Sequence, residues 1–168
     1  AQERGKRGGT ENVPGIAAMA AALKEACANM DENTKKVTAL RDRLIDGIAK
    51  IPHCALNGAR SPRLPGNVNF CFEGIEGESL LLLLDAKGIS ASSGSACTSG
   101  SLDPSHVLLA IGRPHEVAHG SLRLTICEDN TEEGIDYILA ELPPIVSYLR
   151  DMSPVWKDLM SGKRQFTL

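Results

Sequence analysis

The sequence has no long hydrophobic run, no excess of basic residues and no closely spaced cysteine pair. The leucine run Leu80–Leu84 is far shorter than the roughly 20 apolar residues that cross a bilayer, which argues against a membrane protein. The 18 Lys and Arg against 21 Asp and Glu give a net charge of −3, so no surface for nucleic acid is expected. The five cysteines form no CxxC motif and the amino end carries no secretory signal, which favours a reducing, cytoplasmic setting.

What is present is the composition of an ordinary globular domain, with 42% hydrophobic and 23% charged residues. Apolar residues recur every three or four positions between Met19 and Ile48, apart from one gap of seven, which is typical of one long helix or of two joined near residues 29–31. Alternating apolar residues predict strands within NVNFCFEG (67–74) and GSLRLTIC (120–127), and a short strand is expected around 54–56 inside a turn-rich connection. We therefore expect an α+β fold, with a long connecting helix and a small antiparallel or mixed sheet covered by helices.

Capping and turn residues predict where the other helices begin and end. A short, deeply buried helix is expected to end at Gly88 in a left-handed turn, and residues 89–91 should form a brief strand. A second helix is expected to start at Pro104 with Asp103 as its cap. A third should start in a capping-box pattern at Asn130, and Pro143–Pro144 should kink or break it.

Cys97 lies in a run of serine, glycine and threonine, SSGSACTSGSLDPS, over residues 92–105. A cysteine normally behaves as a small hydrophobe, but this segment supplies little to bury it and is expected to be poorly ordered. Because the thiolate is the attacking form of cysteine, an accessible loop suits a nucleophile. A loop cysteine without a chemical role is the alternative. The glycine spacing does not match the hydrolase motif G-x-S-x-G, and the lysine of a phosphate-binding P-loop is absent.

Residues 115–119 read HEVAH, which matches the zinc motif H-E-x-x-H. On a helix, His115 and His119 would share one face and could bind zinc, with Glu116 as a general base. A glycine and a proline before the motif and a glycine after it leave room for about one and a half turns of helix. We therefore interpret the motif as two partly exposed histidines in a connection, and we expect no metal site.

Three segments together resemble the pyridoxal-phosphate-dependent cysteine desulfurases, which are members of the class-V aminotransferases. The segment SSGSACTSGSLDPSHVLLAIG is similar to the active-site cysteine segment of that family. The opening QERGKRGGTEN is similar to the stretch in which a threonine reaches the cofactor phosphate. The segment AHGSLRLTICEDNTEEGID resembles the strand with the substrate-binding arginine and the helix that follows it. The order and approximate spacing of the three segments also agree with the family.

The resemblance implies roles for three residues. Cys97 would attack the sulfur of L-cysteine, leaving L-alanine and an enzyme persulfide that passes sulfur to an acceptor or scaffold protein, for iron–sulfur cluster assembly or another pathway. Arg123 would bind the substrate carboxylate, a task suited to its planar, bidentate donors; a solvated surface arginine is the alternative. Thr10 would bind the phosphate of pyridoxal 5′-phosphate across the interface of a homodimer; a helix cap is the alternative.

The resemblance covers the carboxy-terminal part of such an enzyme, the small domain of a fold-type I pyridoxal enzyme. It implies that residues 1–12 end a larger domain, that 13–50 form the connecting helix and that 51–168 form the small domain. The cofactor lysine of the family follows a histidine, and no His-Lys pair occurs in these 168 residues. We therefore expect this chain alone to be inactive. A cofactor-free sulfur carrier or binding module that uses Cys97 is the second hypothesis.

Overall fold

The computed structural model describes residues 2–93 and 103–168, so Cys97 and the expected disorder around it lie outside the described residues. The chain divides into two compact units, Ala1–Lys35 and Lys36–Leu168. Helix α1 (Val13–Ile48) contributes to both, because the division falls inside it. Among the described helices, none is both long enough and apolar enough to cross a membrane.

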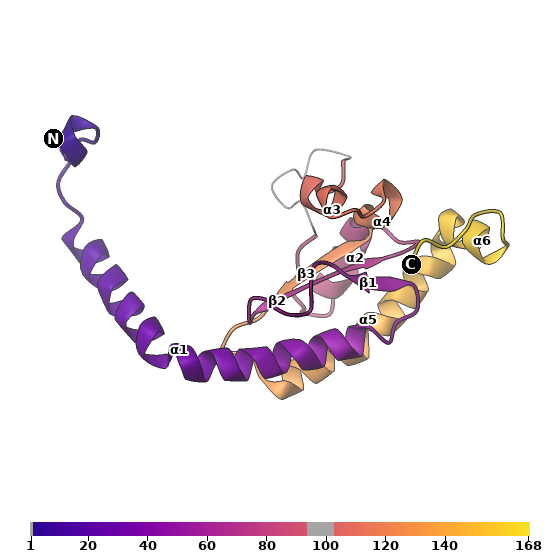
Figure 1. Cartoon of the computed structure of the whole chain (residues 1–168), viewed down its shortest axis with the longest axis horizontal. Coiled ribbons are helices and arrows are strands. Elements are labelled where there is room, and N and C mark those ends of the chain that lie inside the picture. The colour runs from indigo at the N-terminus through magenta and orange to yellow at the C-terminus, as the bar shows by residue number, and fades with distance from the viewer. Residues whose placement is uncertain (1, 94–102) are drawn as a thin grey trace. The chain divides into compact units, whose positions relative to one another are not determined.

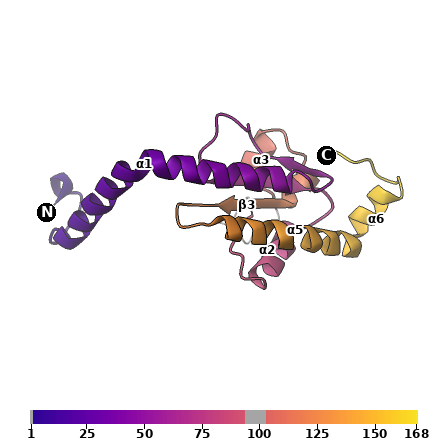
Figure 2. The same ribbon diagram turned by 90° about the horizontal axis from the view of Figure 1, so that it is seen from below.

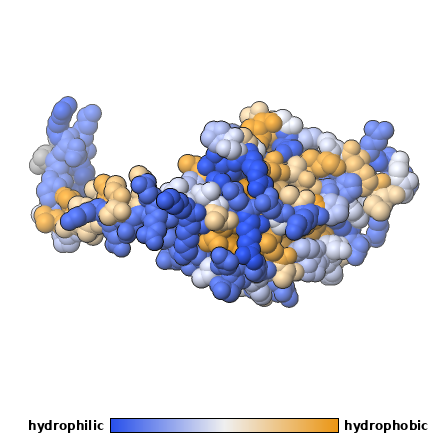
Figure 3. Space-filling view, turned by 60° about the horizontal axis from the view of Figure 1, so that its bottom comes forward, coloured by the Kyte–Doolittle hydropathy of each residue, from blue (hydrophilic) through white to orange (hydrophobic). Residues whose placement is uncertain are grey.

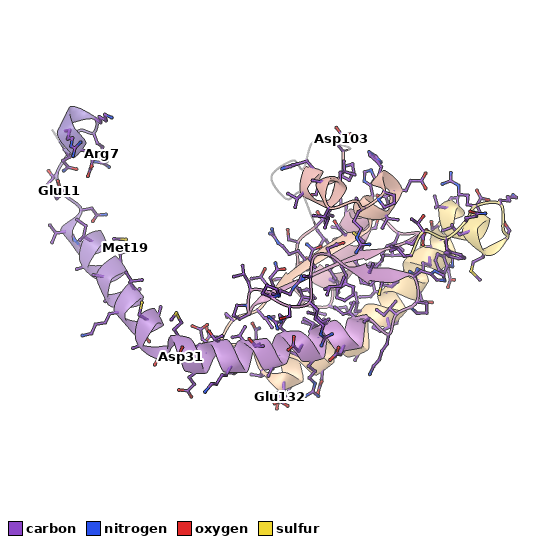
Figure 4. The ribbon with its side chains drawn as sticks, viewed as in Figure 1. Arg7, Glu11, Met19, Asp31, Asp103 and Glu132 are labelled. Atoms are coloured by element: carbon purple, nitrogen blue, oxygen red, sulfur yellow. The ribbon has the colours of Figure 1, made fainter. Side chains whose placement is uncertain are left out.

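The first unit consists of a short 3-10 helix, η1 (Glu3–Gly5), a loop and the first part of α1. The loop is held by backbone hydrogen bonds between Gln2 and Arg7, at 2.7 and 3.2 Å. Apolar side chains on this part of α1 are exposed, Met19 among them at 67%, and Figure 4 shows it extending from the helix. Figure 3 shows such hydrophobic residues lying among hydrophilic ones.

The second unit has its core on one face of an antiparallel sheet with the order β1-β2-β3 (Cys54–Leu56, Asn67–Phe72 and Ser121–Thr125). Strand alternation directs four buried side chains to the core face: Val68, Phe70, Leu122 and Leu124. The part of α1 from residue 36 onwards lies beside α5 (Glu132–Met152) on this face, as Figures 1 and 2 show. Arg43 on α1 joins the two helices by an ion pair of 2.9 Å to Glu132, which is labelled in Figure 4.

The remaining helices are short. Helix α2 (Gly77–Asp85) packs on β3 and α5, and α6 (Pro154–Met160) follows α5. Helices α3 (His106–Ala110) and α4 (His115–His119) lie on the face opposite the core (Figure 1). They rest on a second, smaller apolar cluster: Cys71, Leu108, Val117 and Ala118. The sheet is therefore covered on both faces, which agrees with the predicted α+β fold.

Three predicted boundaries are wrong. Helix α3 begins at His106, after Ser105, and not at Pro104. Residues 89–91 form no strand; only Ser92 pairs with the sheet, through an isolated bridge. The cap of α5 is Thr131, whose hydroxyl accepts a hydrogen bond from the backbone N–H of Gly134 at 3.2 Å. Asn130 instead closes the preceding turn by accepting from the N–H of Cys127. At residue 92 and at the start of α5, a hydrogen bond to another strand or to a neighbouring residue replaces the predicted local one.

Of the predicted kink or break at Pro143–Pro144, the break is wrong, because α5 continues through both prolines. Each proline removes a helical hydrogen bond, at a cost of about 3 kcal/mol. The residues on either side, Leu142 and Val146, are completely buried in the core, and this burial offsets the loss. The expected deep burial of α2 holds for Leu80 and Leu84, whereas Leu82 is 68% exposed, so this helix is amphipathic.

Gly120, just before β3, lies tightly against the backbone at the end of β2. A Cβ atom at this position would lie 2.1 Å from the carbonyl oxygen of Phe72, and Gly120 accepts a hydrogen bond from the Phe72 N–H at 2.8 Å. We expect Gly120→Ala to lower the free energy of unfolding by about 3 kcal/mol, because the strands must separate. Urea unfolding followed by circular dichroism measures the change.

Gly134→Ala is the matched control for this prediction. A Cβ atom there meets only the Thr131 hydroxyl oxygen, at 3.6 Å, and the position lies in the first turn of α5. The control should leave stability unchanged or raise it by about 0.5–1 kcal/mol. Equal unfolding midpoints for the two variants would contradict the packing explanation.

Candidate functional site

Arg123 lies in the middle of β3 on the face opposite the core, and its side chain is exposed. Its backbone pairs with Ser92 in both directions, with Arg123 N–H to Ser92 oxygen at 2.6 Å and Ser92 N–H to Arg123 oxygen at 3.0 Å. Ser92 is the first residue of the segment 92–105, which contains Cys97. The guanidinium makes no ion pair within residues 2–93 and 103–168. Such a group can bind a carboxylate through two hydrogen bonds. The sheet face on which Arg123 lies, opposite the core, is called the polar face below.

Thr10 lies exposed in the loop before α1. The alternative that it caps this helix is wrong, because the side-chain oxygen of Asn12 accepts the hydrogen bond from the Gly15 N–H at 3.1 Å. Gly9 before it has φ of +109°, a conformation that favours glycine, and Arg7 donates to the Gly8 oxygen at 2.7 Å. A hydroxyl, glycine N–H groups and nearby cationic side chains are a donor set that fits a phosphate group. The loop is therefore compatible with the phosphate of pyridoxal phosphate.

A hydrogen-bonded network lies on the same polar face as Arg123. Arg113, which follows α3, donates from Nε to Asn57 Oδ1 at 2.7 Å and from Nη2 to the Leu56 oxygen at 2.6 Å. Asn57 in turn donates from Nδ2 to Asn69 Oδ1 at 2.6 Å. This network could not be predicted from the sequence, because Asn57 lies in a turn-rich stretch. The alternation of β2 does put Asn69 on the polar face, but its proximity to Arg123 depends on the strand register.

Two of the described cysteines, Cys54 and Cys71, have surroundings that disfavour the thiolate. Burial raises the pKa of the Cys71 thiol, although the hydrogen bond from Asn57 and the charge of Arg113 act in the opposite direction. Burial also raises the pKa of the Cys54 thiol. Cys27 and Cys127 are exposed. These thiols give no reason to move the predicted nucleophile from Cys97 to a described cysteine.

The HEVAH motif forms the five-residue helix α4 in the connection between α3 and β3, which agrees with the expected limit of one and a half turns, and His115 is exposed and His119 half-buried, as predicted. The His115 and His119 rings contact each other edge to face, with 4.8 Å between their centroids. Glu116 is paired with Arg164 at 3.0 Å. The motif lines a cavity of about 1080 Å³. No group of three or more potential ligands is found in the described part of the chain, so α4 offers only two neighbouring histidines.

The sequence profile of the class-V aminotransferases matches residues 2–138, and the chain therefore belongs to this family. It is 58% identical over 167 residues to a protein named cysteine desulfurase IscS from Clostridium botulinum. It is 50% identical over 156 residues to cysteine desulfurase NifS from Azotobacter vinelandii. These alignments cover 98% and 92% of this chain but 42% and 39% of the relatives, so the chain spans about two fifths of their length.

Two solved structures share the fold. One is a NifS-like protein with a TM-score of 0.76 and 34% identity, covering 88% of this chain and 37% of that one. The other is a NifS-like protein from Rickettsia africae with a TM-score of 0.76 and 27% identity, covering 87% of this chain and 38% of that one. These similarities confirm the predicted family and the α+β fold.

Proposed function

We propose that this chain is part of a pyridoxal-phosphate-dependent cysteine desulfurase that converts L-cysteine to L-alanine and passes the sulfur to an acceptor protein. The observation that carries the proposal is the two-way backbone pairing of Ser92 with Arg123. It fastens the start of the Cys97 segment beside an exposed arginine that can hold an amino-acid carboxylate. A nucleophile and a substrate anchor are needed close together for such a reaction.

Each of the three predicted residues has a distinct task in this proposal. Arg123 holds the carboxylate of L-cysteine, and Thr10 binds the cofactor phosphate, in the site of the partner subunit of a homodimer. The Cys97 thiolate attacks the substrate sulfur, so that an S–S bond forms and the C–S bond breaks. The β carbon of the substrate keeps the electron pair of the broken C–S bond and takes up a proton, and L-alanine leaves. When bound, the cofactor supplies an electron sink at the substrate α carbon.

The persulfide on Cys97 is the second product, and it requires an acceptor thiol on another protein or a scaffold for iron–sulfur cluster assembly. A free, reactive thiol of this kind is best preserved in a reducing compartment, and we propose a cytoplasmic setting. The neighbouring polar residues of the segment suit a sulfur atom that must meet two molecules in turn.

The 168-residue chain alone is expected to be inactive, because it has no His-Lys pair that could hold the cofactor covalently. Mixed with pyridoxal phosphate and L-cysteine, it should form no more L-alanine than the free cofactor does. The complete protein should form L-alanine catalytically under the same conditions. Chromatographic quantification of L-alanine measures both rates.

The same assay separates the proposal from a cofactor-free sulfur carrier. A complete protein that forms no L-alanine, yet takes up sulfur on Cys97 from a persulfide donor, would support the carrier. Release of L-alanine by the isolated chain that depends on Cys97 would contradict the expected inactivity.

A further inference from the structure

The polar face of the sheet brings Asn69 and Arg123 opposite each other. The register of β2 and β3 pairs Asn69 with Arg123, and residues that pair across an antiparallel sheet have their side chains on the same face. The side chain of Asn69 is partly buried and that of Arg123 is exposed, whereas their neighbours Val68 and Leu122 are buried in the core. The two polar side chains therefore share the face that carries the candidate site.

The backbone hydrogen bonds show that these two side chains are close neighbours. The Asn69 carbonyl accepts from the Asn57 N–H at 2.8 Å, on the β1 side, and the N–H and carbonyl of Arg123 both pair with Ser92, on the other side. Asn69 and Arg123 consequently form a non-hydrogen-bonded pair of the ladder. In such pairs the side chains approach most closely, with Cβ atoms about 4.5–5.5 Å apart.

Arg113 fixes which way the amide of Asn69 faces. A guanidinium can only donate, so the Asn57 atom that lies 2.7 Å from Arg113 Nε must be the amide oxygen. The Nδ2 group of Asn57 is then the donor to Asn69, and the Asn69 atom 2.6 Å away must be its oxygen. The NH₂ group of Asn69 is thereby directed away from Asn57. The network presents a second donor group beside Arg123.

We propose that Asn69 is a second binding residue for the α-carboxylate of the amino-acid substrate, and that Arg113 positions it through Asn57. The guanidinium of Arg123 and the NH₂ group of Asn69 offer donors to the two carboxylate oxygens. This inference rests on the proposed function, in which Arg123 binds that carboxylate. It explains why the polar network of Arg113, Asn57 and Asn69 ends next to an exposed arginine.

Asn69→Asp tests the inference in the complete protein. Aspartate still accepts the hydrogen bond from Asn57, so the network is preserved, but the donor is replaced by a negative charge that repels a carboxylate. The inhibition constant of L-alanine, the product, should rise about 10-fold or more. The inhibition constant of cysteamine, which lacks the carboxylate, should stay within about twofold. A purely structural role of Asn69 would weaken both ligands equally.

Asn67→Asp is the matched control, since Asn67 lies on the same face of β2 two residues before Asn69, opposite Thr125. The side-chain oxygen of Asn67 accepts a hydrogen bond from Arg63 Nη2 at 3.0 Å, and an aspartate oxygen can accept the same bond. This variant introduces the same charge and should leave the inhibition constant of L-alanine within about twofold. A similar rise in both variants would overturn the inference.

Arg113 is tested by substitutions that keep or remove its donor to Asn57. Arg113→Met should raise the inhibition constant of L-alanine about threefold to fivefold, and Arg113→Lys should restore part of the affinity. If Asn69→Asp fails to fold, Asn69→Thr removes the NH₂ group with a residue that suits a strand. An unchanged inhibition constant of L-alanine in a folded Asn69 variant would overturn this inference but not the proposed function. A wild-type protein that forms no L-alanine from L-cysteine would overturn the proposed function itself.

Discussion

Replacing Cys97 by serine in the complete protein should lower the rate of L-alanine formation by about 10³-fold or more. A serine hydroxyl is not ionised near neutral pH and cannot form a persulfide, whereas a thiolate is both a strong nucleophile and a sulfur acceptor. Loss of a covalent nucleophile is among the largest single effects in enzyme kinetics. Two measurements check the result: L-alanine formation with excess cysteine, and the mass of the protein after one turnover, which should show no added sulfur atom.

Cys127→Ser is the control for the Cys97 prediction. Cys127 is exposed, as a reactive thiol would be, and it lies in the same unit two residues after the end of β3. Its removal should leave the rate and the sulfur uptake of the protein unchanged. Retained L-alanine formation by Cys97→Ser, or a loss of equal size in Cys127→Ser, would contradict the assignment of the nucleophile.

Replacing Arg123 by glutamine should lower kcat/KM for L-cysteine about 10²- to 10³-fold, mostly through KM. Hydrogen bonds to charged groups contribute about 1.5–3 kcal/mol each, and the planar guanidinium can form two of them to one carboxylate. Lysine would restore only part of the loss, because its ammonium is a compact point charge without the planar fork. Steady-state kinetics with L-cysteine, at saturating cofactor, separates the effects on KM and kcat.

Arg60→Gln is the matched control for the Arg123 variant. Arg60 is another exposed arginine of the second unit, and its ion pair with Asp46, at 2.6 Å, lies on the surface. The control removes the same charge and should leave kcat/KM within about twofold. Because the Arg123 side chain is exposed, its loss should also leave the unfolding midpoint nearly unchanged. A fall in stability that accounts for the activity loss would argue against a binding role.

The strands were predictable from the sequence because their alternation is local. Val68, Phe70 and Phe72 point to one side and Asn67 and Asn69 to the other, and this pattern alone predicts a half-buried strand at the observed position. The long helix was predictable in the same way, since apolar residues continue at helical spacing to Ile48, with one gap of seven positions.

Elements whose limits depend on distant contacts were not predictable. The prolines of α5 predict a break when only the helix itself is considered, and burial of Leu142 and Val146 against other elements keeps the helix intact. Helix α3 likewise begins at His106 and not at Pro104, with Leu108 buried in the apolar cluster under the helix. Local propensity is a weak guide where tertiary burial decides.

The candidate site was predictable only in part. The positions of Thr10, Cys97 and Arg123 came from the resemblance to a family, and the roles of all three remain predictions. The neighbours of Arg123 could not be found, because they come from three separate parts of the chain: Asn57, Asn69 and Ser92. Only the pairing of the strands brings these residues together, and a single sequence does not contain it.

The reciprocal backbone hydrogen bonds between Ser92 and Arg123 also make local opening measurable by hydrogen–deuterium exchange. Each backbone amide of the pair is shielded from solvent by the other residue, so neither proton can exchange with deuterium while the bridge is closed. Ligand binding at the Arg123 guanidinium that opens the bridge to Ser92 would therefore change deuterium uptake at the same time in two peptides, one containing Ser92 and one containing Arg123.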